Sequence, residues 1–224
     1  MLALVLAIIP PIGILLYYWR QDQRRPEPKG LILKIFAIGC LSVIPIGLLE
    51  LGLMQVVGPL PFWPKVLLEA FIIAALVEEF GKRWVVHRYA YGHNAFDEVH
   101  DGVLYTIVAS LGFACLENIL YSVGDPSVAL LRAFTAVPMH ALASGLMGYY
   151  IGLAKFSGGE PERRGHFAKG LGAAVGFHGV YDFFLMSQTL LAVLVVPLLL
   201  WGFVHLRRRL VHVQHLDRAQ LDAA

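Results

Sequence analysis

Long apolar stretches, each of roughly 20 residues, recur along the whole chain and are separated by short polar connections. A helix of roughly 20 residues is long enough to cross the hydrocarbon of a bilayer. The stretches are continuous and do not alternate between apolar and polar residues, which disfavours a membrane β-barrel. The pattern predicts an all-α, polytopic transmembrane helix bundle. The predicted spans are Leu2–Trp19, Leu31–Val57, Val66–Val86, Gly102–Val123, Ala133–Ala154, Lys169–Met186 and Leu190–His205.

The composition agrees with a multi-pass membrane protein. The 224 residues are 58% hydrophobic and 15% charged, whereas soluble domains usually carry roughly 25% charged residues. The net charge of +2 gives no indication of a nucleic-acid partner. No connection is long enough to fold alone. We therefore expect one integral membrane domain over residues 1–224, in contact with the lipid bilayer, with its polar motifs confined to about residues 66–186.

Basic residues favour one orientation of these helices. They gather in or after alternate spans, at Arg20–Lys29, Lys82–Arg88, Lys155–Lys169 and Arg207–Arg209. Because basic connections remain in the cytoplasm, we predict an external N-terminus and a cytoplasmic C-terminus. The first span has no basic residue before it and no small-residue cleavage site after it, so it is expected to be a retained anchor.

Four of the predicted spans carry polar side chains well away from their ends, where an ionised group is costly. The residues are Glu78, Glu79 and Lys82 in the third span, Glu117 and Asn118 in the fourth, His140 in the fifth, and His178 and Asp182 in the sixth. They lie at similar depths when counted along each helix. We therefore expect them to form one site.

Spacing supports a shared face for two pairs of these residues. Glu78 and Lys82 are four positions apart, as are His178 and Asp182, so each pair lies on one side of its helix. Lys82 can partly neutralise Glu78, and Asp182 can fix the tautomer of the imidazole. Glu78 and Glu79 point about 100° apart on a helix. One carboxylate could therefore hold the structure while the other acts as a base.

Single residues of this set also have structural interpretations. A lone histidine inside a membrane, such as His140, often bridges two helices through hydrogen bonds. Lys82 and Arg83 could extend to the cytoplasmic surface of the membrane. The set as a whole is harder to explain in this way, because many buried polar groups at one depth are expensive for a chain of this size.

Other polar residues are interpreted as structural. Asp101 precedes the fourth span and is expected to be its N-cap. The polar residues from His93 to Asp101 resemble metal ligands in composition, but we expect a solvated loop. Glu50 has no partner that the sequence identifies, and it is also assigned a structural role.

The polar motifs resemble those of the PrsW family of intramembrane proteases, which is distantly related to the CAAX prenyl endopeptidases. The matching segments are "EEFGK" (78–82), "DGVLYTIVASLGFACLEN" (101–118), "RAFTAVPMHALASGLMGYYIG" (132–152) and "HGVYD" (178–182), in the order of that family. The element from Phe113 to Glu117 is similar to PrsW proteins and differs from CAAX enzymes, which carry a histidine at the position of Glu117.

The resemblance implies hydrolysis of a peptide bond in or near the outer half of the membrane. Members of this family look like site-1 proteases that cut a membrane-anchored anti-sigma factor on its extracytoplasmic side, so an anti-sigma-factor-like substrate is expected. The resemblance implies catalytic roles for Glu78, Glu79, Glu117 and His178. The supporting residues would be Lys82, Asn118, Arg132, His140 and Asp182.

Water is the expected nucleophile, because no serine or cysteine has a convincing base in the sequence. In one mechanism, Glu78 or Glu79 takes the proton of the water molecule. His178, held by Asp182, then positions the water or stabilises the oxyanion.

A second mechanism uses Zn²⁺, and the sequence does not decide between the two. Two histidines and one carboxylate are a common ligand set for catalytic zinc. The possible ligands are Glu117, His140, His178 and Asp182, with Glu78 or Glu79 as the general base.

Two functions other than proteolysis are compatible with the sequence. Buried acids and histidines also form proton relays in membrane transporters, although the chain shows no paired halves of the kind found in inverted-repeat transporters. A non-catalytic scaffold could bind the transmembrane helix of a partner through the glycine-rich segments "GLMGYYIG" and "GLGAAVG".

The orientation can be tested with reporter fusions. Reporters placed after Trp19 and after Ala154 should indicate a cytoplasmic location, and a reporter placed after Val57 should indicate an external one. A cytoplasmic signal from the connection between Pro59 and Pro64 would contradict the predicted spans.

Overall fold

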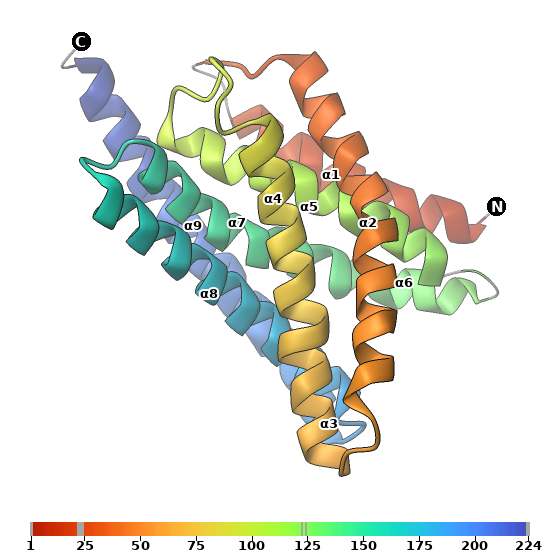
Figure 1. Cartoon of the computed structure of the whole chain (residues 1–224). Coiled ribbons are helices and arrows are strands. Elements are labelled where there is room, and N and C mark those ends of the chain that lie inside the picture. The colour runs from red at the N-terminus through yellow and green to blue at the C-terminus, as the bar shows by residue number, and fades with distance from the viewer. Residues whose placement is uncertain (1, 22–24, 122, 124, 223–224) are drawn as a thin grey trace.

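The computed structural model describes residues 2–21, 25–121, 123 and 125–222, and in these ranges the chain is helical, without strands (Figure 1). The all-α class predicted from the apolar pattern is confirmed. The elements are α1 (Leu2–Gln21), α2 (Lys29–Val57), α3 (Phe62–Leu68), a π-helical segment (Glu69–Leu76), α4 (Val77–Tyr89), α5 (Val99–Tyr121), α6 (Pro126–Phe134), α7 (Ala136–Lys155), α8 (Glu160–Met186), a 3-10 segment (Leu190–Leu194) and α9 (Val195–Asp222).

The helices coincide with the seven apolar stretches, although three stretches are built from more than one element. Helix α3, the π-helical segment and α4 follow one another without interruption, and Thr135 separates α6 from α7. Helical segments that are long and apolar enough to cross a membrane are Lys29–Val57, Val99–Tyr121, Ser127–Lys155 and Leu190–Asp217. The structure thus supports a membrane-embedded helix bundle, while the full count of seven spans and their orientation stay predictions.

Helices α5 and α7 form the centre of the bundle. Every residue of α5 from Val99 to Cys115 is buried, and α7 is buried over most of its length. Helices α2 and α4 cover one side of this centre, and α8 and α9 cover another (Figure 1). The central pair therefore sits where polar side chains can be kept away from lipid.

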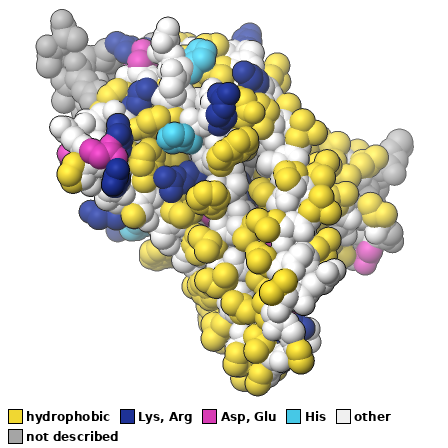
Figure 2. Space-filling model, viewed as in Figure 1, with side chains coloured by type: hydrophobic (Ala, Val, Ile, Leu, Met, Phe, Trp, Pro, Cys, Tyr) yellow, Lys and Arg dark blue, Asp and Glu magenta, His cyan; other side chains and the backbone are white. Residues whose placement is uncertain are grey.

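The outer surface is apolar, as a bilayer-facing surface requires. Helix α2 exposes Leu33, Leu41 and Leu48. In Figure 2, hydrophobic side chains cover the tapering part of the molecule, and most of the visible Lys, Arg and His side chains gather at the opposite end. This separation of apolar and basic surfaces agrees with a molecule embedded in a membrane, with one end at the lipid headgroups.

Glycines allow α5 and α7 to pack at backbone contact. A Cβ atom added to Gly148 would lie 2.4 Å from the carbonyl oxygen of Gly102, and one added to Gly102 would lie 2.4 Å from the amide nitrogen of Gly152. The segment "GLMGYYIG" therefore packs within the chain rather than offering a glycine face to a partner helix. Part of "GLGAAVG" differs, because Cβ atoms added to Gly172 and Gly176 would meet no atom within 4 Å.

The expected loop before α5 is partly buried, which corrects the prediction of a solvated loop. Glu98, His100 and Asp101 expose 6%, 5% and 1% of their surface. Asp101 is also not the N-cap, since α5 begins at Val99. Its Oδ2 atom accepts hydrogen bonds from the backbone N–H groups of Asp97 and Glu98, at 2.9 and 2.7 Å.

The N-terminus of α5 is instead capped by α9. Asp217 accepts hydrogen bonds from the backbone N–H groups of Val99 and His100, at 2.8 and 3.2 Å. A carboxylate is stabilised there by the unpaired N–H groups and by the helix dipole. The contact is possible because α9 extends to Asp222, well beyond the apolar stretch that predicted it.

Candidate active site

Four helices contribute polar side chains to one buried cluster. Helix α4 carries Glu78, Glu79 and Lys82, and it follows directly on the π-helical segment that ends at Leu76. Helix α5 carries Glu117, helix α7 carries His140, and helix α8 carries His178 and Asp182. Short π-helical insertions are frequent beside functional sites, and here one sets the direction of the helix that carries the two glutamates.

Lys82 lies at the centre of the cluster and is completely buried. Its ammonium group donates to Glu78 Oε2 at 3.0 Å, to Glu79 Oε1 at 2.8 Å and to His140 Nδ1 at 2.9 Å. An ammonium has three N–H groups, so each has an acceptor. The side chain therefore does not extend to the membrane surface, because three acceptors hold it inside the bundle.

The bonds of His140 determine its tautomer. Since Nδ1 accepts from the Lys82 ammonium, the proton of a neutral ring is on Nε2. Nε2 lies 2.9 Å from Glu117 Oε2, to which it donates. The same carboxylate oxygen accepts from Arg132 Nη2 at 2.6 Å. His140 thus bridges α4 and α5, and Arg132 neutralises the acidic residue at the far side of the ring.

Both carboxylate oxygens of Glu79 accept hydrogen bonds from neighbouring side chains. Its Oε1 atom receives Lys82 and His178 Nδ1, the latter at 3.0 Å, and its Oε2 atom accepts from Ser144 Oγ at 2.8 Å. The side chain exposes none of its surface. Ser144, one helical turn after His140, thus orients Glu79, a role that the sequence analysis did not assign to it. This geometry gives Glu79 a holding role.

His178 lies between two carboxylates. Nδ1 is 3.0 Å from Glu79 Oε1, and Nε2 is 3.2 Å from Asp182 Oδ2. The contact with Asp182, four residues later on α8, agrees with the spacing in the sequence. Both ring nitrogens can donate to carboxylates only in the imidazolium form, so this arrangement favours a positively charged ring.

Glu78 has the less constrained carboxylate of the pair. Its Oε2 atom bonds to Lys82 and lies 3.8 Å from His140 Nδ1 and 4.0 Å from His178 Nε2. Its Oε1 atom has no hydrogen bond to a residue that the structure describes, and the side chain is 6% exposed. Of the two glutamates, Glu78 is therefore the one with an oxygen available to a water molecule.

Two further residues at the cluster have buried polar atoms without a hydrogen-bond partner in the described part of the chain. Both amide atoms of Asn118 are in this state, as is Oε1 of Glu50 on α2. Glu50 is close enough to Glu78 and Glu117 for their charges to act on it, so it lies near the site. The sequence feature that could have identified Glu50 is its position as a lone carboxylate within a long apolar helix. Buried polar groups usually have a partner, so both residues are available to water or to a substrate.

Glu78, Glu79, His140 and His178 could hold a metal ion, because one ligand atom from each lies within 4.8 Å of the others. Two imidazoles and one carboxylate suit catalytic zinc, which also binds a water molecule, and this set offers a second carboxylate. This set differs from the predicted one. Glu117 and Asp182 contact the outer nitrogens of the two histidines, which is the position of residues that orient metal ligands.

The donor set fits zinc, but Lys82 already supplies a cation to it. The ammonium hydrogen-bonds to three of the four groups. A divalent ion among the same atoms would be repelled by the ammonium at short range. Metal binding in this place therefore requires the Lys82 side chain to withdraw or to lose its proton.

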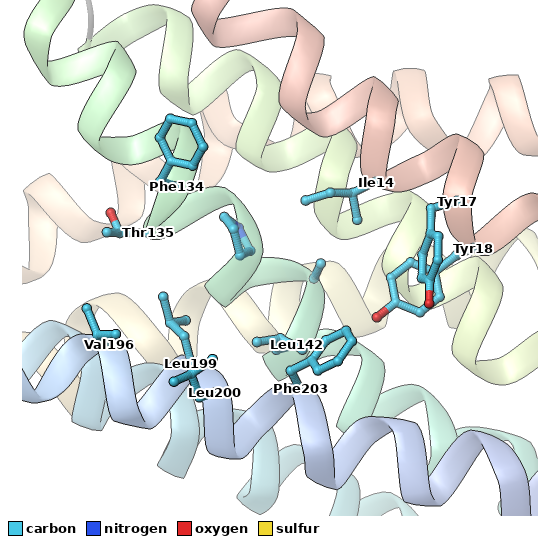
Figure 3. Close-up of a pocket in the computed structure, with 12 residues that line it drawn as sticks. Ile14, Tyr17, Tyr18, Phe134, Thr135, Leu142, Val196, Leu199, Leu200 and Phe203 are labelled. Atoms are coloured by element: carbon cyan, nitrogen blue, oxygen red, sulfur yellow. The ribbon is translucent and has the colours of Figure 1, made fainter.

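The apolar cavities lie beside the cluster rather than in it. One of about 490 Å³ is lined by α1, α6, α7 and α9, and its walls include Ile14, Leu142 and Phe203 (Figure 3). Another, of about 420 Å³, lies between α2 and α4. Its lining residues Leu49 and Val77 immediately precede Glu50 and Glu78 in the sequence, although these two glutamates do not line it.

Comparisons with known proteins identify relatives over most of the chain. The model of the PrsW family intramembrane metalloproteases matches residues 27–206. Protease PrsW of Geobacillus kaustophilus (strain HTA426) is 38% identical over 185 residues, which cover 81% of this chain and 78% of the relative. Protease PrsW of Bacillus subtilis (strain 168) is 36% identical over 200 residues, which cover 88% and 89%. No solved structure matches the chain.

Replacing Lys82 with methionine should destabilise the protein strongly. The change keeps the length of the side chain but leaves Glu78 and Glu79 buried without their cation, and breaking a buried pair in this way costs about 3–5 kcal/mol. Thermal unfolding of the purified protein in detergent measures the loss. Arg83→Met is the control, since Arg83 is partly exposed and packs over the ring of Phe167. Equal unfolding temperatures for the two variants would contradict the central role of Lys82.

Proposed function

The chain belongs to the PrsW family of intramembrane proteases and is a membrane protease, and we propose that it cuts a membrane-anchored, anti-sigma-factor-like protein in or near the outer half of the membrane. The observation that carries this proposal is the buried cluster of two glutamates and two histidines around Lys82. It combines a candidate base with groups that orient water, inside a bundle that otherwise excludes water. The proposed location is a multi-pass position in the cell membrane.

In the proposed mechanism, Glu78 takes a proton from the attacking water molecule. Glu78 Oε1, which has no hydrogen bond to a described residue, can accept a hydrogen bond from this water molecule while Oε2 stays bonded to Lys82. His178 Nε2 lies 4.0 Å from Glu78 Oε2, so the positively charged ring is close to the reacting atoms. Attack on the carbonyl carbon forms an oxyanion, which the positive charges of His178 and Lys82 stabilise. The proton held by Glu78 then passes to the leaving amine.

The surrounding residues keep these groups in place. Glu79 and Asp182 hold the ring of His178 from opposite nitrogens. Glu117 and Arg132 hold His140, which in turn orients the Lys82 ammonium. Such fixed dipoles and charges are most effective in a site that excludes water, because they need not reorganise during the reaction.

Zinc is the alternative means of activating the water molecule, and the group of Glu78, Glu79, His140 and His178 could hold it. His140, His178 and one of Glu78 and Glu79 would be its ligands, together with a water molecule, and a bound zinc ion would supply Lewis acidity and make that water molecule more acidic. In that case Glu117 and Asp182 would orient the histidine ligands from behind. Lys82 would then have to leave the position that it occupies between the acceptors.

The substrate must enter the bundle, because the cluster is almost completely buried. The groove between α2 and α4 is lined by apolar side chains, among them Leu49 and Val77, which precede Glu50 and Glu78 in the sequence. An extended segment of the substrate that passes inward from this groove could direct a backbone N–H group at the buried, unpaired oxygen of Glu50. A carboxylate at this point would compensate for helical hydrogen bonds that the substrate loses on unwinding.

The function can be tested with conservative variants of the two glutamates. Glu78→Gln keeps the shape of the side chain but removes the base, and it should lower cleavage by about 10²–10⁴-fold. Glu79→Gln should lower both cleavage and thermal stability, because Glu79 anchors Lys82, Ser144 and His178. Cleavage is measured by immunoblotting in proteoliposomes, with a tagged single-span anti-sigma factor from the same genome.

Glu69→Gln provides the matched control for these glutamate variants. Glu69 lies on the same continuous helix but pairs with Lys65 at 3.8 Å, and it is 22% exposed. This variant should cut the substrate at the wild-type rate. Normal cleavage by both Glu78→Gln and Glu79→Gln would show that the proposed mechanism is wrong.

The two sources of activation are distinguished by metal content and by chelation. If zinc is bound, the purified protein should contain it stoichiometrically, a strong chelator should abolish cleavage, and His178→Ala should lose both the metal and activity. If Glu78 activates water alone, chelators should leave cleavage unchanged, and His178→Ala should lose activity only. Asp182→Asn should weaken cleavage in both cases but lower zinc affinity, by about 10–100-fold, only in the first.

A further inference from the structure

A second large groove lies between α7, α8 and α9, on the side of the bundle away from α2 and α4. Its volume is about 640 Å³, and its walls are mainly apolar. Helix α8 contributes Gly172 and Gly176, whose missing side chains leave open space. Helix α9 contributes a stripe of side chains at helical spacing that includes Leu198, Trp201 and His205. None of the lining residues belongs to the cluster described above.

The length of the groove matches one leaflet of a bilayer. The lining residues that follow α8 run from Leu194 to Arg209. Fifteen residues at the rise of a helix correspond to about 22 Å. Half of a bilayer, including its headgroup region, measures about 20–22 Å. The groove can therefore extend from the membrane surface to the middle of the membrane.

One end of the groove is cationic. The Arg209 guanidinium lies over the ring of Tyr149 at 4.8 Å and over that of Tyr150 at 5.8 Å, and it donates to Tyr149 Oη at 3.4 Å. It forms no ion pair with a carboxylate among the residues that the structure describes. Most of its five N–H donors are therefore available. His205 lies one turn earlier along the groove, stacked on Trp201 with 5.0 Å between ring centroids.

We propose that this groove binds one anionic phospholipid, with an acyl chain along α8 and α9 and its phosphate at Arg209 and His205. The unneutralised charge at one end and the apolar walls over the rest match the two halves of such a lipid. A partner helix with an apolar face is a poorer fit, because it would leave the charge of Arg209 without a counterion, whereas a lipid phosphate pairs with it.

The lipid would contact the reverse side of two helices that carry the polar cluster. Phe177 lines the groove on α8 and directly precedes His178. Leu146 lines it on α7, less than two turns after His140. The bound lipid would fill the space that Gly172 and Gly176 leave between α8 and α9, and so complete the packing behind the histidines.

Fluorescence quenching by brominated lipids can test the proposal, because Trp201 lines the groove. A variant with Trp201 as its single tryptophan (Trp19→Phe, Trp63→Phe, Trp84→Phe) is placed in phosphatidylcholine nanodiscs. Phosphatidylglycerol or phosphatidylcholine with brominated acyl chains is then added in increasing mole fraction. Half-maximal quenching should need about fivefold less brominated phosphatidylglycerol, since one basic residue contributes roughly that factor.

Matched variants separate the groove from general attraction to a basic surface. Arg209→Gln should remove the preference for phosphatidylglycerol, whereas Arg207→Gln, exposed on the same helix outside the groove, should keep it. Gly176→Leu should fill the groove without a clash and reduce the preference. A variant that retains only Trp84, 53% exposed on α4, should show no preference. Circular dichroism confirms that each variant is helical.

Several outcomes would overturn the proposal. Equal quenching of Trp201 by the two lipids would show that the groove does not select an anionic headgroup. An equal loss of the phosphatidylglycerol preference in Arg207→Gln and Arg209→Gln would show attraction to the basic surface only. The same preference in the variant that retains only Trp84 would lead to the same conclusion. Displacement of the brominated lipid by millimolar glycerol phosphate would indicate a phosphate site that does not need the lipid chains.

Discussion

The ammonium group of Lys82 is the interaction on which the rest of the site depends. It donates to Glu78, Glu79 and His140, and none of its surface is exposed. An isolated charge in an apolar interior is strongly unfavourable, so the two carboxylates and the lysine are stable there only together. Two of these bonds lie within α4, and the third, to His140, joins α4 to α7. The contacts of one side chain therefore both arrange the two glutamates and connect two helices of the bundle.

The two carboxylates around Lys82 have different environments, and this difference assigns their roles. Glu79 is surrounded by three donors and exposes no surface, whereas Glu78 keeps one oxygen without a bond to a described residue. A base needs an oxygen that can accept a proton from water, while a holding residue needs fixed partners on both oxygens. Adjacent positions in one motif can thus serve structure and chemistry separately, because they point in different directions from the helix.

The surrounding bundle allows such a site to exist in lipid. Close glycine contacts bring α5 and α7 together at the centre, and the apolar surface faces outward. Burial strengthens the electrostatic effect of each polar group but also restricts access by water and by substrate. The groove between α2 and α4 and the lipid-sized groove behind His178 lie on different sides of this centre. The first is suited to an entering peptide and the second to a resident lipid, because only the second has an unneutralised cation at its end.

The sequence by itself determined the helical class, the positions of the apolar helices and most of the polar residues that meet in the buried cluster. Continuous apolar stretches leave few alternatives to helices, since a chain in lipid must satisfy its own backbone hydrogen bonds. Rare polar residues within those stretches stand out for the same energetic reason. The contact between His178 and Asp182 was also predictable, because residues four apart on a helix are neighbours.

Only the tertiary structure decided how residues from different helices are paired. Spacing within a helix cannot tell that Lys82 turns inward to His140, that Glu79 rather than Glu78 holds His178, or that Glu50 lies near the cluster. It also cannot tell that Asp217, more than a hundred residues away along the chain, caps α5. These contacts depend on the rotation and relative depth of packed helices. Both are set by side-chain and glycine packing across the whole bundle, which a local pattern in the sequence does not contain.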